Sequence, residues 1–227
     1  MLDFLMGKVS TLTALLLLSL AAKPVKIDTS GFLSIVGNWS VVSDNGRSVT
    51  MADGRPWKRG QPAGGLADKA RLIYGSRNEE FIDNVKAFAY FPYAVAQEIP
   101  EFQNGEISMR FKIIDGQLDQ CAGILFNLKP NGDYLTVRFN GKEDNLVLWT
   151  FKAGKRSFVK KGVEDAPLEM KKWHRMKIQV NGTALKGYLN DRLLLEYTLP
   201  EPVNGRVGLW SKTDSVIYYD DYTVSPE

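Results

Sequence analysis

The residues best suited to chemistry lie in the stretch LTVRFNGKEDNLVLW, residues 135–149. It reads as two strands joined by a turn, with apolar and polar residues alternating along both strands. If the apolar side chains face a core, the opposite face presents the polar set and one indole. The residues that share this face are Arg138, Asn140, Asn145 and Trp149, with Glu143 in the turn at their edge.

These side chains have the chemistry of a saccharide site. Guanidinium, amide and carboxylate groups donate and accept hydrogen bonds in fixed directions, which suits the paired hydroxyls of a sugar. The indole of Trp149 can carry the apolar face of a pyranose ring. The alternative is a solvated sheet, in which Arg138 and Glu143 form an ion pair that contributes under about 1 kcal/mol.

A second polar cluster lies in WSKTDSVIYYDD, residues 210–221. Lys212, Thr213 and Asp214 occupy a predicted turn between two strands. If this turn approaches the hairpin, Lys212 joins the substrate-binding set and Asp214 becomes a second carboxylate beside Glu143. The alternative is a solvated connection between strands.

The elements that must position these groups are short strands along nearly all of the chain. They are rich in β-branched and aromatic residues and are separated by turn pairs such as Asn181-Gly182. Because no later segment has a sustained helical period, we expect hardly any helix. The segments ARLIYG (70–75) and VKAFAYF (85–91) are assigned as strands, and residues 53–69 as a loop. The sequence therefore predicts an all-β, two-sheet antiparallel sandwich.

The first 21 residues have the features of a signal peptide. The apolar run VSTLTALLLLSLAA ends in small residues, which predicts cleavage after Ala21 or Ala22. The run is shorter than the roughly 20 apolar residues of a membrane-spanning helix. We expect an extracytoplasmic (secreted or periplasmic) protein without stable membrane insertion; an uncleaved anchor is the alternative. We assign 1–21 to the signal peptide, 22–35 to an N-terminal tail and 36–227 to the sandwich domain.

Composition and two single residues exclude several functions. The formal charge of +3 is spread over both signs with no basic block, so no nucleic-acid partner is expected. Cys121 is the only cysteine and lies in an apolar run, which predicts a buried thiol and no intramolecular disulfide. His174 shares its predicted face with apolar residues, which favours a hydrogen-bonded core histidine over a catalytic or zinc-binding one.

Three segments carry a resemblance to a known superfamily. WHRMKIQVNGTALKGYLNDRLLLEYT (173–198), the ending NGRVGLWSKTDSVIYYDDYTV and the opening GNWSVVSDNG resemble the concanavalin A-like lectin/glucanase superfamily. Within it, the chain is most similar to the LamG-like and 3-keto-disaccharide hydrolase families, also called family-16-glycoside-hydrolase-like. The resemblance covers roughly residues 36–224. It implies a concanavalin A-like jelly roll whose concave face often accepts sugars, with lectin or hydrolase roles.

The resemblance also implies a metal position. In relatives, an aspartate near the last strand helps to bind a structural Ca²⁺, which here corresponds to Asp220 or Asp221. Calcium takes six to eight oxygen ligands, and the sequence offers only one or two at this point. The alternative is that both are ordinary exposed residues.

The sequence offers few candidates for the catalytic carboxylates of a glycoside hydrolase. A glycosidase needs two carboxylates, about 5–5.5 Å apart for retention or about 6.5–9.5 Å for inversion. The family-16 glucanase pattern Glu-x-Asp-x-(x)-Glu is absent from this chain. Carboxylates distant in sequence remain as candidates, namely Glu143 and Asp214, then Asp83 and Asp119.

These observations predict an exported module that recognises a glycan on the concave sheet face, and they favour binding over turnover. The first alternative is a glycoside hydrolase acting on a disaccharide, including a 3-keto one, or on a polysaccharide. The second is a protein-interaction module that binds no sugar.

Overall fold

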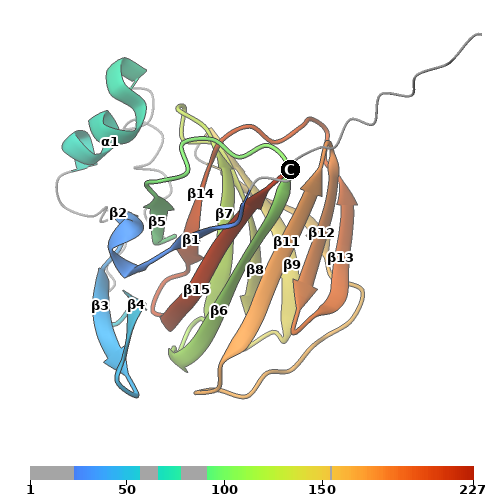
Figure 1. Ribbon diagram of the computed structural model, residues 1–227. Helices are drawn as coiled ribbons and strands as arrows, with labels where there is room; N and C mark the ends of the chain where they lie inside the picture. The colour runs from blue at the N-terminus through green and yellow to red at the C-terminus, as the bar shows by residue number, and fades with distance from the viewer. Residues whose placement is uncertain (1–22, 57–65, 78–90, 154) are drawn as a thin grey trace, which may run out of the picture.

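The computed structural model describes residues 23–56, 66–77, 91–153 and 155–227. Two antiparallel β-sheets pack face to face in this part of the chain (Figure 1). The predicted all-β, two-sheet sandwich is therefore confirmed. The predicted signal peptide lies outside the described residues. None of the described helices is both long and apolar enough to cross a membrane.

One sheet has eight strands, hydrogen-bonded in the order β13-β12-β11-β6-β15-β4-β3, with β1 paired to β15. Its strands are β1 (Val25–Ile27), β3 (Trp39–Asp44), β4 (Arg47–Asp53), β6 (Gly105–Asp115), β11 (His174–Asn181), β12 (Ala184–Leu189), β13 (Arg192–Thr198) and β15 (Val216–Pro226).

The other sheet has seven strands in the order β10-β9-β8-β7-β14-β5-β2. Its strands are β2 (Phe32–Val36), β5 (Tyr93–Ala96), β7 (Cys121–Leu128), β8 (Tyr134–Asn140), β9 (Asn145–Lys152), β10 (Lys155–Lys161) and β14 (Arg206–Ser211).

The sandwich begins earlier than the sequence predicts. Strands β1 and β2 fall within residues 22–35 or just beyond, the segment assigned to a tail. Val25 pairs with Val224 on β15, and Leu33 pairs with Val95 on β5. Each sheet therefore takes one strand from this segment, and Ile27 is buried in the core.

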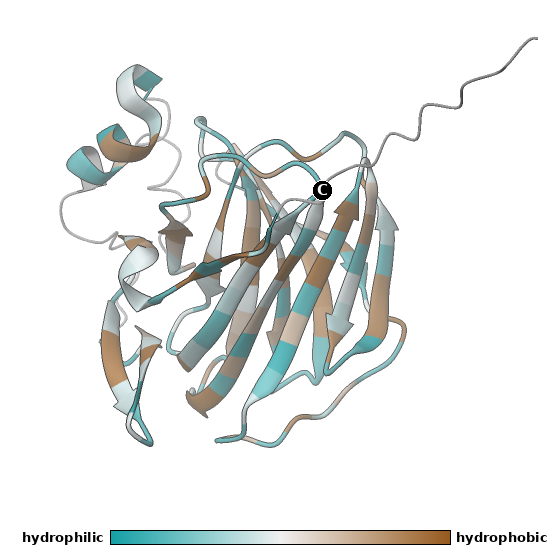
Figure 2. Cartoon of the chain, viewed as in Figure 1, coloured by the Kyte–Doolittle hydropathy of each residue, from teal (hydrophilic) through white to brown (hydrophobic). Residues whose placement is uncertain are grey.

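The main core lies between the two sheets. Figure 2 shows hydrophobic and hydrophilic bands alternating along many of the strands, as expected when one face of each sheet is buried. The apolar residues of the 135–149 hairpin lie in this core as predicted, with Val137, Phe139, Leu146 and Leu148 fully buried. This burial fixes which side chains of the hairpin face outward.

The turns follow the predicted chemistry. Asn190 and Asp191 form the two-residue connection between β12 and β13, and both have positive φ, 48° and 63°. A type I′ hairpin turn needs this conformation at both central positions, and asparagine and aspartate tolerate it better than most residues. Gly182 supplies a positive φ of 57° at the β11–β12 turn.

The prediction of a strand at residues 70–75 is wrong. The segment forms part of α1 (Leu66–Tyr74), which is followed by a short 3-10 turn, Gly75–Arg77. A second 3-10 turn covers Thr29–Gly31. Ile73 and Tyr74 follow Ala70 by three and four residues, and all three pack on the outer face of the seven-stranded sheet. Tertiary contacts therefore favour a helix here. Most of the predicted strand at 85–91, and residues 57–65 of the predicted loop, lie outside the described residues.

Cys121 is fully buried and free, as predicted. Burial raises the pKa of its thiol to about 12, so the sulfur stays protonated and unreactive at neutral pH.

Candidate functional site

The predicted polar face of the hairpin is the outer face of β8 and β9. Asn140 pairs with Asn145, Arg138 with Val147, and Thr136 with Trp149. With the apolar residues in the inter-sheet core, Arg138, Asn145 and Trp149 point away from it. The structure thus places these three predicted residues on one face of the seven-stranded sheet.

Arg138 is the centre of a fixed hydrogen-bond network. Its Nη1 donates to the Asn145 backbone oxygen at 3.2 Å and to Asn145 Oδ1 at 2.5 Å, and its Nη2 donates to Glu143 Oε2 at 2.7 Å. The Arg138 side chain is only 6% exposed, whereas the Glu143 side chain is 47% exposed. The cation is therefore held in place, and the carboxylate keeps an open side that a ligand can reach.

Gly123 on β7 leaves room for this arrangement. A Cβ atom at this position would lie 3.1 Å from Arg138 Cβ and 3.1 Å from Trp210 Cε3. Both contacts are tighter than ordinary packing allows. The absence of a side chain at residue 123 lets Arg138 and Trp210 lie on either side of it.

Trp149 forms an aromatic and cationic platform with two residues of β10. The Arg156 guanidinium lies 4.3 Å from the centre of the Trp149 ring. Phe158 meets Trp149 edge-on with ring centres 5.7 Å apart, and Phe158 is 60% exposed. We call Arg138, Glu143, Asn145, Trp149, Arg156 and Phe158 the open corner.

Sequence reasoning missed Arg156 and Phe158, although a signal for them exists. They alternate on one strand, and β10 pairs with β9 so that Phe158 lies opposite Trp149 and Arg156 opposite Phe151. Once the β9–β10 connection is read as a hairpin, this register follows from the positions of the apolar residues.

Asn140 and Lys212 meet through Asp119 rather than at the open corner. Asn140 is 1% exposed, and its Oδ1 accepts hydrogen bonds from the backbone N–H groups of Gln120 (3.2 Å) and Lys142 (3.1 Å). Asp119 Oδ1 accepts from Lys212 Nζ at 2.8 Å and lies 3.4 Å from Asn140 Nδ2. The two predicted clusters therefore touch, but these groups are already hydrogen-bonded within the protein.

Asp214 caps a turn. Its carboxylate accepts backbone hydrogen bonds from Gln117 (2.8 Å), Leu118 (2.9 Å) and Asp119 (3.0 Å). Burial disfavours the charged form, but these backbone donors outweigh it and lower the pKa of Asp214. Glu143 belongs to the Arg138 network instead, so the two candidate carboxylates serve different contacts. Asp83 lies outside the described residues.

The only histidine has a structural environment. His174 Nε2 lies 2.8 Å from the Glu169 carbonyl oxygen, and its Nδ1 lies 3.3 Å from Asn190 Nδ2. Its ring centre is 5.8 Å from that of Phe111, at the edge of the core. The predicted hydrogen bonds of His174 are confirmed, but the prediction that it is buried in the core is wrong, because the side chain is half-buried at the edge of the core.

Asp220 and Asp221 are surrounded by cations on the eight-stranded sheet. Arg47 Nε lies 2.8 Å from Asp220, Arg110 Nη2 lies 2.7 Å from Asp220, and Lys26 Nζ lies 2.7 Å from Asp221. Burial works against ionisation of Asp221, but Lys26, Arg110 and Arg47 together lower its pKa. Among the described residues, no group of three or more His, Cys, Asp or Glu could hold a metal ion. The calcium site stays a prediction, and a bound ion would have to displace these cations.

On the outer face of the seven-stranded sheet, the half that lies away from the open corner is covered. Ring centres of Tyr134 and Phe151 stack 4.2 Å apart, and Trp210 Nε1 lies 3.2 Å from Tyr134 Oη. Helix α1 lies over this half, beside β2 and β5 (Figure 1). Tyr74 Oη donates to the Leu128 carbonyl oxygen at 3.1 Å, which fastens the helix to β7. The open corner is therefore the part of this face left accessible by the described residues.

Comparison with known proteins identifies the fold. No family model and no curated protein matches the sequence. Among solved structures, a carbohydrate-binding module of class CBM66 from Bacillus subtilis is similar over 86% of this chain and 96% of its own, with a TM-score of 0.60 and 15% identity. A Bacillus subtilis protein of unknown function with a galectin-like fold covers 87% and 90%, with a TM-score of 0.55 and 12% identity.

A candidate glycosyl hydrolase from Parabacteroides distasonis is also similar. It covers 88% of this chain and 90% of its own, with a TM-score of 0.52 and 11% identity. At these identities the likeness establishes architecture and nothing finer. The chain shares the sandwich architecture of these proteins, and its membership of the concanavalin A-like superfamily stays a prediction.

Proposed function

We propose that this protein is an exported carbohydrate-binding module that recognises a glycan at the open corner of the seven-stranded sheet. The observation that carries the proposal is the juxtaposition of the Trp149–Phe158 platform with the half-exposed carboxylate of Glu143. Fold likeness to a carbohydrate-binding module supports it by analogy. The proposal includes membership of the LamG-like or 3-keto-disaccharide hydrolase families, which the sequence resembles.

The open corner combines the two kinds of contact that sugars use. The exposed Phe158 supplies apolar area for a pyranose face, beside the Trp149 ring over which Arg156 lies. Glu143 accepts hydrogen bonds from sugar hydroxyls, and its orientation is fixed by Arg138. Because Arg138 is itself held by Asn145, little side-chain entropy is lost when a ligand binds.

The test is a titration of the purified protein against oligosaccharides and 3-keto-glycosides, followed by tryptophan fluorescence, with mass spectrometry of the same samples. We expect a fluorescence change with intact sugar, abolished by Trp149→Ala and weakened by Phe158→Ala. Tyr188→Ala is the matched control, because Tyr188 is a half-buried aromatic beside a cation, Lys177 at 4.6 Å, on the opposite sheet.

Three results would contradict this proposal. Equal losses in Trp149→Ala and Tyr188→Ala would place the effect outside the open corner. Cleavage products that disappear in Glu143→Gln would make the protein a glycoside hydrolase. No response to any sugar, in a protein that copurifies with another chain, would make it an interaction module.

Export forms part of the proposal and rests on residues 1–21 alone. Expression of the full chain in a secreting host, followed by N-terminal sequencing of the product, tests it. A mature terminus at Ala22 or Lys23 in the extracytoplasmic fraction is expected. An uncleaved product in the membrane fraction would indicate an anchor instead.

A further inference from the structure

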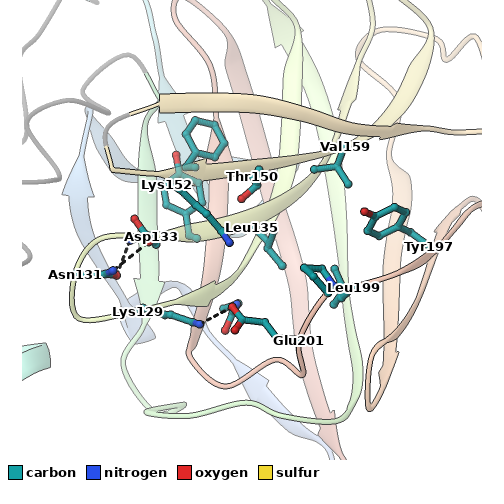
Figure 3. Close-up of a pocket in the computed structure, with 14 residues that line it drawn as sticks. Lys129, Asn131, Asp133, Leu135, Thr150, Lys152, Val159, Tyr197, Leu199 and Glu201 are labelled. Atoms are coloured by element: carbon teal, nitrogen blue, oxygen red, sulfur yellow. Dashed lines mark hydrogen bonds and ion pairs between the residues drawn. The ribbon is translucent and has the colours of Figure 1, made fainter.

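A hollow of about 300 Å³ opens between the two sheets, on the inner side of β9 from the open corner. Leu135, Val159 and Leu199 supply apolar walls, and Tyr197 lies at one side (Figure 3). Trp149 and Thr150 are neighbours on β9 and point to opposite faces of the sheet. The hollow is therefore separate from the open corner.

Thr150 leaves a hydrogen bond unmade in this hollow. Its Oγ1 is buried and has no hydrogen-bond partner. A buried hydroxyl without a partner destabilises a protein by about 1–3 kcal/mol, so native structures rarely contain one without a reason. Figure 3 shows the Thr150 hydroxyl and the Lys152 ammonium directed into the same space.

Two lysines and two acids line the hollow, and their pairing differs. Lys129 Nζ pairs with Glu201 Oε1 at 2.9 Å. Asp133 accepts hydrogen bonds from Asn131 Nδ2 at 3.0 Å and from the Ala153 backbone at 2.9 Å. Both acids are thus hydrogen-bonded by other donors. Lys152 forms no close ion pair within the described ranges, although its charge contributes, after that of Lys129, to lowering the pKa of Glu201.

We propose that this hollow binds a small amphipathic carboxylate, such as a medium-chain fatty acid. The carboxylate pairs with Lys152 and accepts a hydrogen bond from Thr150 Oγ1. The hydrocarbon chain lies against Leu135, Val159 and Leu199, where each buried methylene contributes about 0.8 kcal/mol.

The test uses the full chain with octanoate as the probe, followed by calorimetry and by chemical-shift changes at the hollow. Octanol has the same chain without the charge, and we expect it to bind about tenfold more weakly. Lys152→Met should reduce octanoate affinity by a similar factor and leave octanol unaffected. Thr150→Val keeps the side-chain shape, removes the unpaired hydroxyl, and should weaken octanoate binding about threefold or more.

Lys155→Met is the matched control, because Lys155 is an exposed cation on the adjoining strand and does not line the hollow. We expect it to leave octanoate affinity unchanged. Equal affinity for octanol and octanoate, equal losses in Lys155→Met and Lys152→Met, or no binding at millimolar octanoate would each overturn the proposal. None of these results bears on sugar binding at Trp149.

Discussion

Trp210 and Trp149 lie on the same face of the same sheet, yet their environments differ. Trp210 is 1% exposed, its ring stacks on Phe91 with centres 5.7 Å apart, and its Nε1 donates to Tyr134. Trp149 is half-buried, and the groups against it are Arg156 and the exposed Phe158. Because α1 covers only one half of the face, the outward side chains around Trp210 are buried in an aromatic cluster. Around Phe158 the outward side chains stay accessible.

The opposite sheet offers a second contrast. Trp173 also has cations over its ring, Arg110 and Lys112, each 4.9 Å from the ring centre. Those cations pair with acids, Arg110 with Asp220 at 2.7 Å and Lys112 with Asp44. Arg156 has no such carboxylate partner among the described residues. The cations beside Trp173 are therefore paired with acids, whereas Arg156 beside Trp149 can pair with a ligand.

The largest expected effect is a difference in the free energy of unfolding between alanine variants of the two tryptophans. Trp210→Ala removes a fully buried indole and its hydrogen bond, so we expect a loss of about 3–5 kcal/mol in the free energy of unfolding. Trp149→Ala removes a half-buried ring and should lose less than half as much. Urea unfolding of both variants measures this difference. Equal losses would show that the open corner is as much a part of the core as the covered half.

The next effect concerns the ion pair that orients the open corner. Arg138→Met leaves Asn145 and Glu143 without their donor and should destabilise the fold by about 2–3 kcal/mol. Glu143→Gln keeps a hydrogen-bonding side chain at an exposed position and should lose under about 1 kcal/mol. Thermal and urea unfolding of the pair provide the measurement. A larger loss in Glu143→Gln would mean that the carboxylate is structural and not free for a ligand.

The outward face of the hairpin could be predicted because one period-2 pattern controls it. Leu146 and Leu148 can be buried only if Asn145 and Trp149 face outward. Arg138 follows in the same way from Val137 and Phe139. The roles of Asn140 and Asp214 could not be predicted, because their partners at residues 117–120 come from a different part of the chain and are set by tertiary packing.

The helix at 66–74 escaped prediction for a related reason. The segment is short, and its apolar positions at Ala70, Ile73 and Tyr74 carry too little periodicity to exceed the strand pattern of ARLIYG. What stabilises the helix is the aromatic surface beneath it, together with a hydrogen bond from Arg206 Nη2 to the Ile73 carbonyl oxygen at 2.8 Å. Neither contact is visible from the local sequence.

A smaller effect should appear as a change in acid sensitivity. The pKa of Asp214 is lowered from 3.8 in the folded state, so its ionised form stabilises the fold fully above that value. This contribution is lost as the pH falls through the folded-state pKa. Asp214→Asn weakens three backbone hydrogen bonds, and we expect a loss of about 1–2 kcal/mol at pH 7.

The difference between wild type and Asp214→Asn should shrink below about pH 4. Urea unfolding between pH 3 and pH 7 measures it. Asp191→Asn is the control, because Asp191 is exposed in a turn with a positive φ that asparagine also tolerates. A difference that stays constant with pH would show that the charge of Asp214 is not what holds the 116–120 turn.

The smallest effect on stability should accompany a large effect on function. Phe158→Ser changes a side chain that is 60% exposed on an edge strand, so we expect the free energy of unfolding to change by no more than about 0.5 kcal/mol. Sugar affinity should fall, because Phe158 supplies the exposed part of the platform. Val41→Ser, at a 54% exposed position on the other sheet, is the matched control for both measurements. If the two variants bind sugar equally well, the platform at Trp149 is not a binding surface, and the difference between the two halves of the sheet is one of packing alone.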